Sequence, residues 1–179
     1  MISVFHLTSS DKSNILSVLN NLLSSSYSTV SLSSQKLCLN RSCDYLLCCS
    51  PIVKEISGNN TIIILDTVPE NCKPINIDGN IVAAVSSYHV QAMLLASQSH
   101  FPTVTCGMGA GDTVTLSSST CDSAVICLQR TIYTLSGDKL EPVEIPITLS
   151  GKLSHDEILL IAAVLFISGN STLLKNASL

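Results

Sequence analysis

The fold is decided by the stretch Ile2-Ser3-Val4-Phe5-His6-Leu7, which opens into the polar loop Thr8-Ser9-Ser10-Asp11-Lys12-Ser13. The first six residues are apolar and β-branched enough to predict a strand. Residues 11–25 repeat apolar side chains with a helical period and predict a helix. Its inward side chains are Ile15, Leu16, Val18, Leu19, Leu22 and Leu23. The stretch therefore predicts a βα unit, the building block of a parallel sheet.

The loop of this unit has the layout of a phosphate-binding loop without its glycines. In nucleotide-binding folds, a strand, a tight loop and a helix with Lys-Ser at its first turn hold phosphate, and glycines let backbone N–H groups close on the oxygens. The positions that require glycine are His6 and Asp11 here, followed by Lys12 and Ser13. Asp11 places negative charge where the phosphates would lie, and its Cβ disfavours positive φ. Lys12, Ser13 and Thr8 are therefore candidate phosphate ligands with a repulsive neighbour.

A second interpretation of the same loop is structural. Short oxygen-bearing side chains accept hydrogen bonds from the free N–H groups in the first turn of a helix, and Ser9, Ser10 and Asp11 are of this kind. We expect a helix cap to be the main role of the segment, in place of an intact ATP site.

Size and composition predict one domain over residues 1–179, with 46% hydrophobic residues to build its core. A net charge of -4, 12% charged residues and 4% aromatics provide neither a basic stripe nor stacking platforms, so we expect no nucleic-acid binding. The N-terminus lacks a basic leader, and the longest apolar run, Ile158 to Ile167, is shorter than a bilayer crossing. We therefore expect a cytoplasmic, soluble protein without membrane contact.

The eight cysteines are spread along the chain without a CxxC pair. Cys48 and Cys49 lie inside an apolar run that begins at Tyr45. Buried thiols that behave as small hydrophobes are the favoured interpretation, and a redox or zinc role is the alternative.

The order of segments predicts an α/β fold with a mostly parallel, Rossmann-like sheet flanked by helices. Residues 1–106 form its βα-rich part, with apolar runs at Thr29 to Leu32, Asp44 to Cys49, Thr61 to Leu65 and Ile81 to Val85, and a strand beginning at Val104. Such runs, without clean alternation, are typical of strands covered on both faces. A helix predicted over residues 87–97 joins the last two strands as a right-handed crossover. Its expected inward residues are Val90, Met93, Leu94 and Leu95.

The remaining residues predict a small sheet and a last helix. Residues 107–151 read as an antiparallel β meander, with strands at Thr113 to Leu116, Ala124 to Leu128, Thr131 to Leu135 and Val143 to Leu149. Residues 152–179 predict a C-terminal helix and tail. Ser154 and Glu157 form a capping box at the start of this helix, and Gly169 stops it after Ile167.

Taken together, the segments resemble the central, ATP-binding domain of the Mur ligases and their folylpolyglutamate synthetase relatives. The stretch 2–14 resembles the family's strand and Gly-Thr-x-Gly-Lys-Thr loop, and Ile81 to Gly107 resembles its strand, helix and strand ending in Thr-Phe-Gly. The family also has a segment that leads into an alanine-rich helix. It is similar to Ile145-Pro146-Ile147-Thr148-Leu149-Ser150-Gly151, which is followed here by Ala162-Ala163. The resemblance implies an ATP-dependent ligase fold whose active members activate a carboxylate as an acyl phosphate for attack by an amine.

Several residues that carry the family's chemistry differ in this chain. Cys48 stands at the position of a magnesium-binding glutamate, and the stretch Asp66 to Asn71, similar to a Thr-Asn-x-x-x-Asp-His motif, contains no histidine. The family's His-Asn is replaced near Ser154-His155. The resemblance with these departures favours a catalytically degenerate homologue, in which ATP and Mg²⁺ are disfavoured cofactors.

Other polar residues invite functional interpretations with simpler alternatives. Gly107-Met108-Gly109-Ala110-Gly111 precedes a predicted strand, so we interpret it as a turn and not as a dinucleotide site. His89 and His155, near helix starts, are interpreted as capping or surface residues. The acids Asp66, Glu70, Asp78 and Asp112 lie near strand ends, where one of them could hold a cation. Ser50, Ser86 and Ser87 also follow strands, but none has the surroundings of a serine hydrolase nucleophile.

Three functions remain open from the sequence. The favoured one is a non-enzymatic binding or regulatory module for an unknown protein partner or small ligand, with no catalytic residues and no resident metal. The first alternative is an ATP-dependent carboxylate-amine ligase component that needs a partner subunit. The second is a structural module whose apolar strands form a homo-oligomer.

Overall fold

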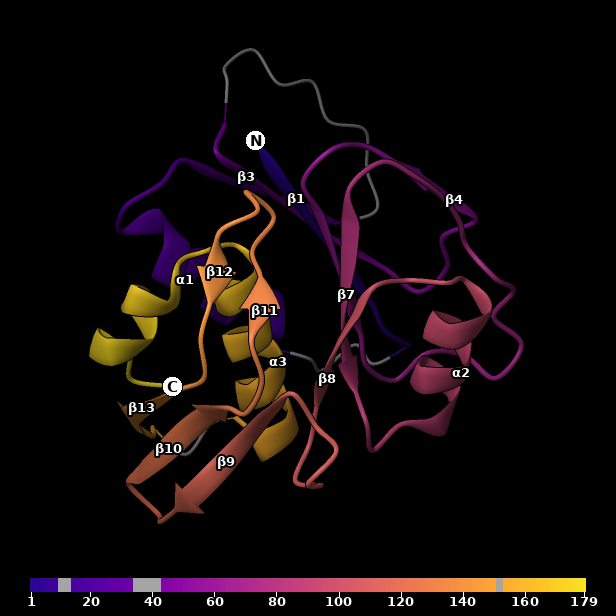
Figure 1. Cartoon of the computed structure of the whole chain (residues 1–179). Coiled ribbons are helices and arrows are strands. Elements are labelled where there is room, and N and C mark those ends of the chain that lie inside the picture. The colour runs from indigo at the N-terminus through magenta and orange to yellow at the C-terminus, as the bar shows by residue number, and fades with distance from the viewer. Residues whose placement is uncertain (10–13, 34–42, 151–152) are drawn as a thin grey trace.

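The computed structural model describes residues 1–9, 14–33, 43–150 and 153–179, and these residues form a nine-stranded sheet with helices on both faces (Figure 1). The strands of the sheet are β1 (Ile2–Leu7), β2 (Thr29–Ser33), β3 (Tyr45–Ser50), β5 (Thr61–Leu65), β7 (Ile81–Ser86), β8 (Thr103–Cys106), β9 (Val114–Ser119), β10 (Ser123–Leu128) and β13 (Val143–Thr148). Their order across the sheet is β13-β10-β9-β8-β7-β5-β1-β3-β2. The helices are α1 (Ile15–Ser24), α2 (Val90–Gln98) and α3 (His155–Ile167), followed by the 3₁₀ helix η1 (Ser171–Asn176).

Strand β1 lies at the point where the chain changes direction across the sheet. It pairs in parallel with β3 on one side and with β5 on the other. The chain therefore builds β2 and β3 on one side of β1, and then crosses over to build β5, β7 and β8 on the other. Ligands of open α/β sheets bind at the carboxyl ends of the strands at such a switch point. The predicted α/β class with a mostly parallel sheet is confirmed.

Helices cover both faces of the parallel strands, as the unbroken apolar runs predict. Along β5, Ile62 and Ile64 belong to the core that includes α1 and α3, whereas Ile63 and Leu65 belong to the core that includes α2. Figure 1 shows α2 on one side of β7, with α1 and α3 on the other. Because side chains alternate along a strand, every second residue faces the α3 side.

The antiparallel part extends the same sheet. β9, β10 and β13 pair in antiparallel order, and β9 joins β8 through the parallel pair Cys106 and Val114. The predicted strand at Thr131 to Leu135 is only β11 (Ile132–Tyr133), which pairs with β12 (Lys139–Leu140) in a separate hairpin. A second small sheet pairs β4 (Glu55–Ser57) with β6 (Asn76–Asp78). No strand was predicted at β4, β6 or β12, because two or three residues are too few to show a periodic pattern.

Helix α3 has the boundaries that its sequence predicts. Ser154 accepts a bond from the N–H of Glu157, and the Glu157 side chain accepts one from the N–H of Ser154, so the capping box is present. Gly169 adopts φ +77° after the last turn, a conformation that glycine adopts without a Cβ penalty. The N–H groups of Gly169 and Asn170 bond back to Phe166 and Leu165, which closes the helix in a Schellman motif. Every residue from Ile158 to Ile167 is buried.

Two helix predictions require correction. Helix α1 begins at Ile15 with Asn14 as its N-cap residue, whereas the prediction began it at Asp11. Helix α2 begins at Val90, and three of its four predicted inward residues were wrong: Val90 is 74% exposed, and Met93 and Leu94 are also exposed. Leu95 is buried, as predicted. The buried residues of α2 are Ala92, Leu95 and Ala96. These residues are spaced i, i+3 and i+4, so they form one face of the helix, whereas the prediction had placed the inward face on Val90, Met93 and Leu94.

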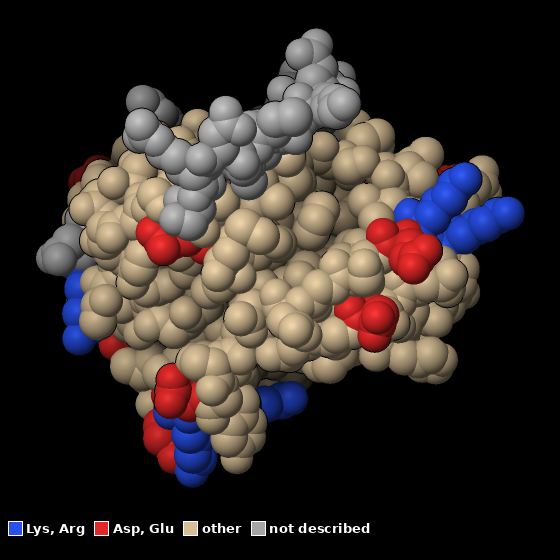
Figure 2. Space-filling view, turned by 90° about the horizontal axis from the view of Figure 1, so that it is seen from above, with Lys and Arg blue, Asp and Glu red and all other residues tan. Residues whose placement is uncertain are grey.

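The surface carries few charges. Figure 2 shows one face on which Lys, Arg, Asp and Glu side chains stand in small, separate groups on a mostly uncharged surface. Among the described residues, no helix has the length and apolar character needed to cross a bilayer.

Candidate functional site

The candidate site lies at the carboxyl ends of β1, β5 and β7, which are neighbours in the sheet. His6 is the fifth residue of β1, Asp66 directly follows β5, and Ser86 ends β7. His6 lies two residues after Val4, and Ser86 two residues after Ala84, so both point to the same face as these members of the core on the α3 side. These polar side chains therefore meet the start of α3, where Asp156 lies in the first turn.

Asp66, His89 and Asp156 form the centre of the site. His89 is the N-cap residue of α2, and its side chain makes no capping bond with the helix. Its Nε2 lies 3.4 Å from Asp66 Oδ1 and 3.5 Å from Asp156 Oδ2. Side-chain ligand atoms of the three residues all lie within 4.8 Å of one another. One imidazole thus bridges two carboxylates that come from different parts of the chain.

The second oxygen of each carboxylate faces an inner residue. Ser86 Oγ donates to Asp156 Oδ1 at 2.7 Å, and His6 Nε2 lies 3.7 Å from Asp66 Oδ2. The His6 side chain is only 2% exposed, and its Nε2 has no hydrogen-bond partner among the described residues. Burial raises the pKa of Asp156, and the negative charge of Asp66 adds to this, while the Ser86 bond and His89 oppose it.

Asp112 forms a separate, structural arrangement beside the site. Its Oδ2 accepts bonds from the Gly109 N–H at 2.8 Å and from Ser87 Oγ at 3.1 Å. A Cβ placed at Gly107 would lie 2.0 Å from Ser87 Oγ and 2.5 Å from Asp112 Oδ2, so a larger residue there would displace these hydrogen-bonded side chains. The interpretation of residues 107–111 as a turn is confirmed, because the segment leads into β9 and not into a helix.

The predicted phosphate residues are only partly described. Thr8 is buried, and its Oγ1 lies 2.9 Å from Thr67 Oγ1 at the end of the neighbouring strand. Ser9 donates through N–H and Oγ to the Thr67 carbonyl. Lys12 and Ser13 lie outside the described residues, as do Ser10 and Asp11 of the proposed cap. The assignment of Thr8, Lys12 and Ser13 to phosphate stays a prediction.

The other flagged residues lie apart from the Asp66–His89–Asp156 cluster. Glu70 and Asp78 are exposed. His155 is exposed at the start of α3, with Nε2 3.2 Å from Ser119 Oγ. Ser50 donates to the Ile52 carbonyl in the loop after β3. The structure therefore selects Asp66 from the four acids that the sequence singled out by their places near strand ends.

The cysteines have varied surroundings. None of the seven that the described residues contain forms a disulfide, and Cys49 and Cys121 are exposed, contrary to the expected burial. Cys106 is the buried one, and burial raises the pKa of its thiol well above the ordinary value. Burial also raises the pKa of Cys48, which is partly covered in β3. Cys48 thus occupies a strand position from which its thiol contributes apolar contact more than charge.

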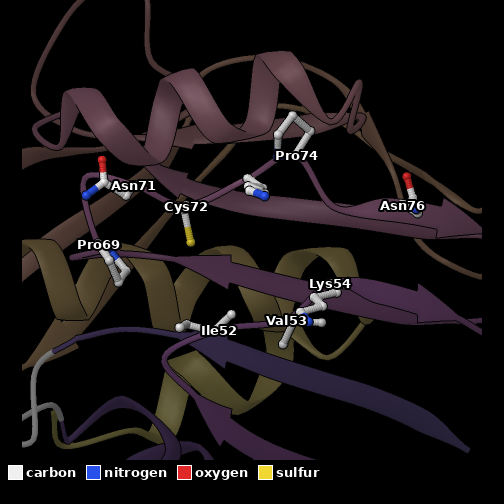
Figure 3. Close-up of a pocket in the computed structure, with 9 residues that line it drawn as sticks. Ile52, Val53, Lys54, Pro69, Asn71, Cys72, Pro74 and Asn76 are labelled. Atoms are coloured by element: carbon white, nitrogen blue, oxygen red, sulfur yellow. The ribbon is translucent and has the colours of Figure 1, made fainter.

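A separate pocket of about 540 Å³ lies between the loops that follow β3 and β5. Figure 3 shows Ile52 and Val53 on one side of it, with Pro69, Cys72 and Pro74 from the other segment. Lys54 and Lys73 also line the pocket. Its lining is mostly apolar, and it contains none of the three residues of the cluster.

Comparison with solved structures places this architecture among Mur ligase-like α/β folds. The chain superimposes on a UDP-N-acetylmuramoylalanyl-D-glutamyl-2,6-diaminopimelate--D-alanyl-D-alanyl ligase from Acinetobacter baumannii with a TM-score of 0.59 and 11% identity, over 99% of this chain and 46% of that chain. A second crystal structure of MurF from the same organism gives the same TM-score, identity and coverage. MurF from Thermotoga maritima in complex with ADP matches with a TM-score of 0.53 and 11% identity, over 98% of this chain and 48% of that chain.

These matches establish the fold, and the chain spans about half the length of the MurF chains. No protein-family model matches the sequence, and no curated protein matches it. The Mur ligase-like fold expected from the resemblance is therefore confirmed at the level of structure.

Sequence reasoning identified parts of the cluster without assembling them. Asp66 was flagged as a possible cation ligand, but His89 was interpreted as a capping or surface residue because no acid stood at a recognisable spacing. Asp66 lies 23 residues before His89 in the chain, and Asp156 lies 67 residues after it. The available signal was that His6, Asp66 and Ser86 all lie at or just after strand ends.

Proposed function

We propose that this chain is a non-enzymatic binding module with a Mur ligase-like fold, and that its ligand binds at the carboxyl edge of β1, β5 and β7. The observation that carries the proposal is the convergence of Asp66, His89 and Asp156 on this edge. Three titratable side chains from separate segments share one partly buried site at the switch point of the sheet, where such folds bind their ligands.

The residues of the first βα unit support binding without ligation. An acyl-phosphate ligase needs backbone amides around the triphosphate and metal ligands beside it. Asp11 stands at a glycine position of that loop, and Cys48 in β3 stands where the resemblance places the magnesium-binding glutamate. A thiol with a raised pKa is a poor substitute for a carboxylate as a ligand for Mg²⁺, which prefers oxygen.

The alternative is an ATP-dependent carboxylate-amine ligase component that a partner subunit completes. The match to MurF in complex with ADP, over 98% of this chain, favours this second function. Thermal unfolding with and without Mg²⁺-ATP separates the two. Micromolar affinity at millimolar ligand would stabilise the fold by about 4 kcal/mol. We expect no shift, and a shift of that size would support the ligase alternative.

Two substitutions in the loop make the test sharper. If residues 8–13 form a silenced phosphate site, Asp11→Gly gains ATP affinity, and Lys12→Ala in the same background removes the gain. If neither substitution changes ATP binding, the helix-cap interpretation of the loop holds.

A structural role in a homo-oligomer is the remaining alternative. Tyr88, Val90, Met93 and Leu94 are exposed on and beside α2, which gives an apolar surface for self-association. Light scattering after size exclusion measures the mass directly. The binding-module proposal includes a location in the cytoplasm, where the module binds a small ligand or a protein partner.

A further inference from the structure

We infer that Asp66, His89 and Asp156 form a site for a divalent transition-metal ion, with Zn²⁺ as the representative ion. The inference rests on the proposed function, because it names the class of ligand that binds at the carboxyl edge of the sheet. One imidazole nitrogen and two carboxylate oxygens form a donor set suited to Zn²⁺, Co²⁺ or Fe²⁺. Mg²⁺ and Ca²⁺ prefer sites made of oxygen alone.

Two of the three distances between the ligand atoms match tetrahedral coordination, and all the ligand atoms lie within 4.8 Å of one another. Bonds of about 2.0–2.2 Å at the tetrahedral angle place neighbouring ligand atoms about 3.3–3.6 Å apart. His89 Nε2 lies 3.4 Å from Asp66 Oδ1 and 3.5 Å from Asp156 Oδ2, so two edges of the tetrahedron are already formed. The His89 side chain is 37% exposed, which leaves a side open to solvent for the fourth ligand.

Two inner residues face the carboxylate oxygens that point away from His89. Carboxylate ligands of metal ions are held by hydrogen bonds to their other oxygen. Ser86 holds Asp156 Oδ1 in this way, while Oδ2 faces His89. His6 stands in the same relation to Asp66, with its Nε2 3.7 Å from Oδ2 while Oδ1 faces His89. A shift of about 0.5 Å brings that pair within hydrogen-bond distance.

The charge of the two carboxylates and the burial of His6 supply an independent argument for a bound ion. The two carboxylates place negative charge in a site whose Asp66 side chain is largely buried. A divalent ion bound to two carboxylates and a neutral imidazole leaves none, which lowers the cost of burial. The buried Nε2 of His6, without a hydrogen-bond partner among the described residues, faces Asp66 and is satisfied when that carboxylate turns toward it.

The test is titration of the full chain with Co²⁺, whose absorption reports geometry and ligand type. We expect one ion per chain with the intense visible bands of tetrahedral cobalt, without a sulfur-to-cobalt charge-transfer band, and displaced by Zn²⁺. The absence of the sulfur band distinguishes this site from the cysteines. His89→Ala and Asp66→Asn should each weaken binding by about 100-fold or more, since even second-shell changes cost about 10–100-fold.

Matched controls come from the same chain. His155→Ala removes an exposed histidine next to Asp156, and Asp122→Asn removes an exposed carboxylate in the turn after β9, so both should keep wild-type affinity. Circular dichroism checks the fold, and His89→Gln, which keeps side-chain bulk, should lose binding like His89→Ala. Binding that survives both His89 substitutions, or that carries a sulfur band, overturns the inference.

The outcomes also separate this inference from the proposed function. No cobalt binding together with no Mg²⁺-ATP shift overturns the metal site but leaves the binding module in place with another ligand. A Mg²⁺-ATP shift in the wild-type chain favours the ligase alternative over the proposed function, whatever the cobalt result is.

Discussion

The Glu157 carboxylate on α3 accepts a hydrogen bond at Oε1 from the backbone N–H of Asn14, which precedes α1, at 3.1 Å. Its other oxygen accepts the N–H of Ser154 at 3.0 Å in the capping box. One side chain therefore caps its own helix and fixes the start of another that lies 143 residues earlier in the sequence. The end of the phosphate-loop-like segment is thus held against the helix that carries Asp156.

Replacing Glu157 by alanine should remove both contacts. A capping interaction contributes about 1 kcal/mol, and the bond to Asn14 adds about the same amount. We expect Glu157→Ala to lower the free energy of unfolding by about 2 kcal/mol, measured by urea denaturation. Glu70→Ala, at an exposed loop acid, should change it by less than about 0.5 kcal/mol. Equal effects of the two substitutions would contradict the double role of Glu157.

The bond from Ser86 to Asp156 predicts a graded effect on metal affinity. If Ser86 acts only as a positioning residue, Ser86→Ala should still bind one Co²⁺ per chain, with affinity reduced about 10–100-fold. Ser87→Ala is the matched control, because Ser87 donates to Asp112 and not to the cluster. The same cobalt titration measures both. An unchanged affinity in Ser86→Ala would show that Asp156 binds the ion without the hydrogen bond from Ser86.

The turn after β8 should tolerate a side chain at one glycine and not at another. A Cβ at Gly107 would lie 2.0 Å from Ser87 Oγ and 2.5 Å from Asp112 Oδ2, whereas a Cβ at Gly111 meets nothing within 4 Å. Gly107→Ala should therefore destabilise the chain by about 1–3 kcal/mol, as overpacking does. Gly111→Ala should be neutral or slightly stabilising. Thermal unfolding of the two variants checks the contrast, and similar melting temperatures would refute it.

Cys106 predicts how stability changes in alkali. Its pKa is raised in the folded chain, so above its ordinary value of 9.0 the unfolded chain releases a proton that the folded chain keeps. Stability is therefore full below about pH 9 and falls as pH rises, by up to about 1.4 kcal/mol per pH unit for this group. Cys106→Ala should show a shallower decline in urea unfolding between pH 8.5 and about 10. Parallel declines in the two proteins would argue against a buried, neutral Cys106.

The same burial predicts selective chemistry of the thiols. Cys49 and Cys121 are exposed and should react with a thiol reagent in the native chain, whereas Cys106 should react only after unfolding. Mass spectrometry of peptides from the alkylated chain distinguishes them. Modification of Cys106 at the rate of Cys121 would contradict its burial.

Most of the fold could be predicted because its signals are local. The apolar runs of β5 and β7 lie within one residue of their predicted positions, since a strand covered on both faces has no polar residues to interrupt it. The capping box of α3 was equally predictable, because Ser154 and Glu157 satisfy each other within one turn. The inward face of α2 was not, because this short helix carries apolar residues on more than one face, with Val90 and Met93 exposed beside the buried Leu95.

The sequence by itself determined the alternation of strands and helices, since spacing of apolar side chains and short capping contacts act within a few residues. It also determined that Asp11 stands where a phosphate loop has glycine. Only the tertiary structure decided that His89 contacts Asp66 and Asp156. Parallel crossovers carry the ends of β1 and β5 to one edge, and α3 packs across the sheet to bring Asp156 there, so contacts between residues 66, 89 and 156 follow from chain topology and not from any local pattern.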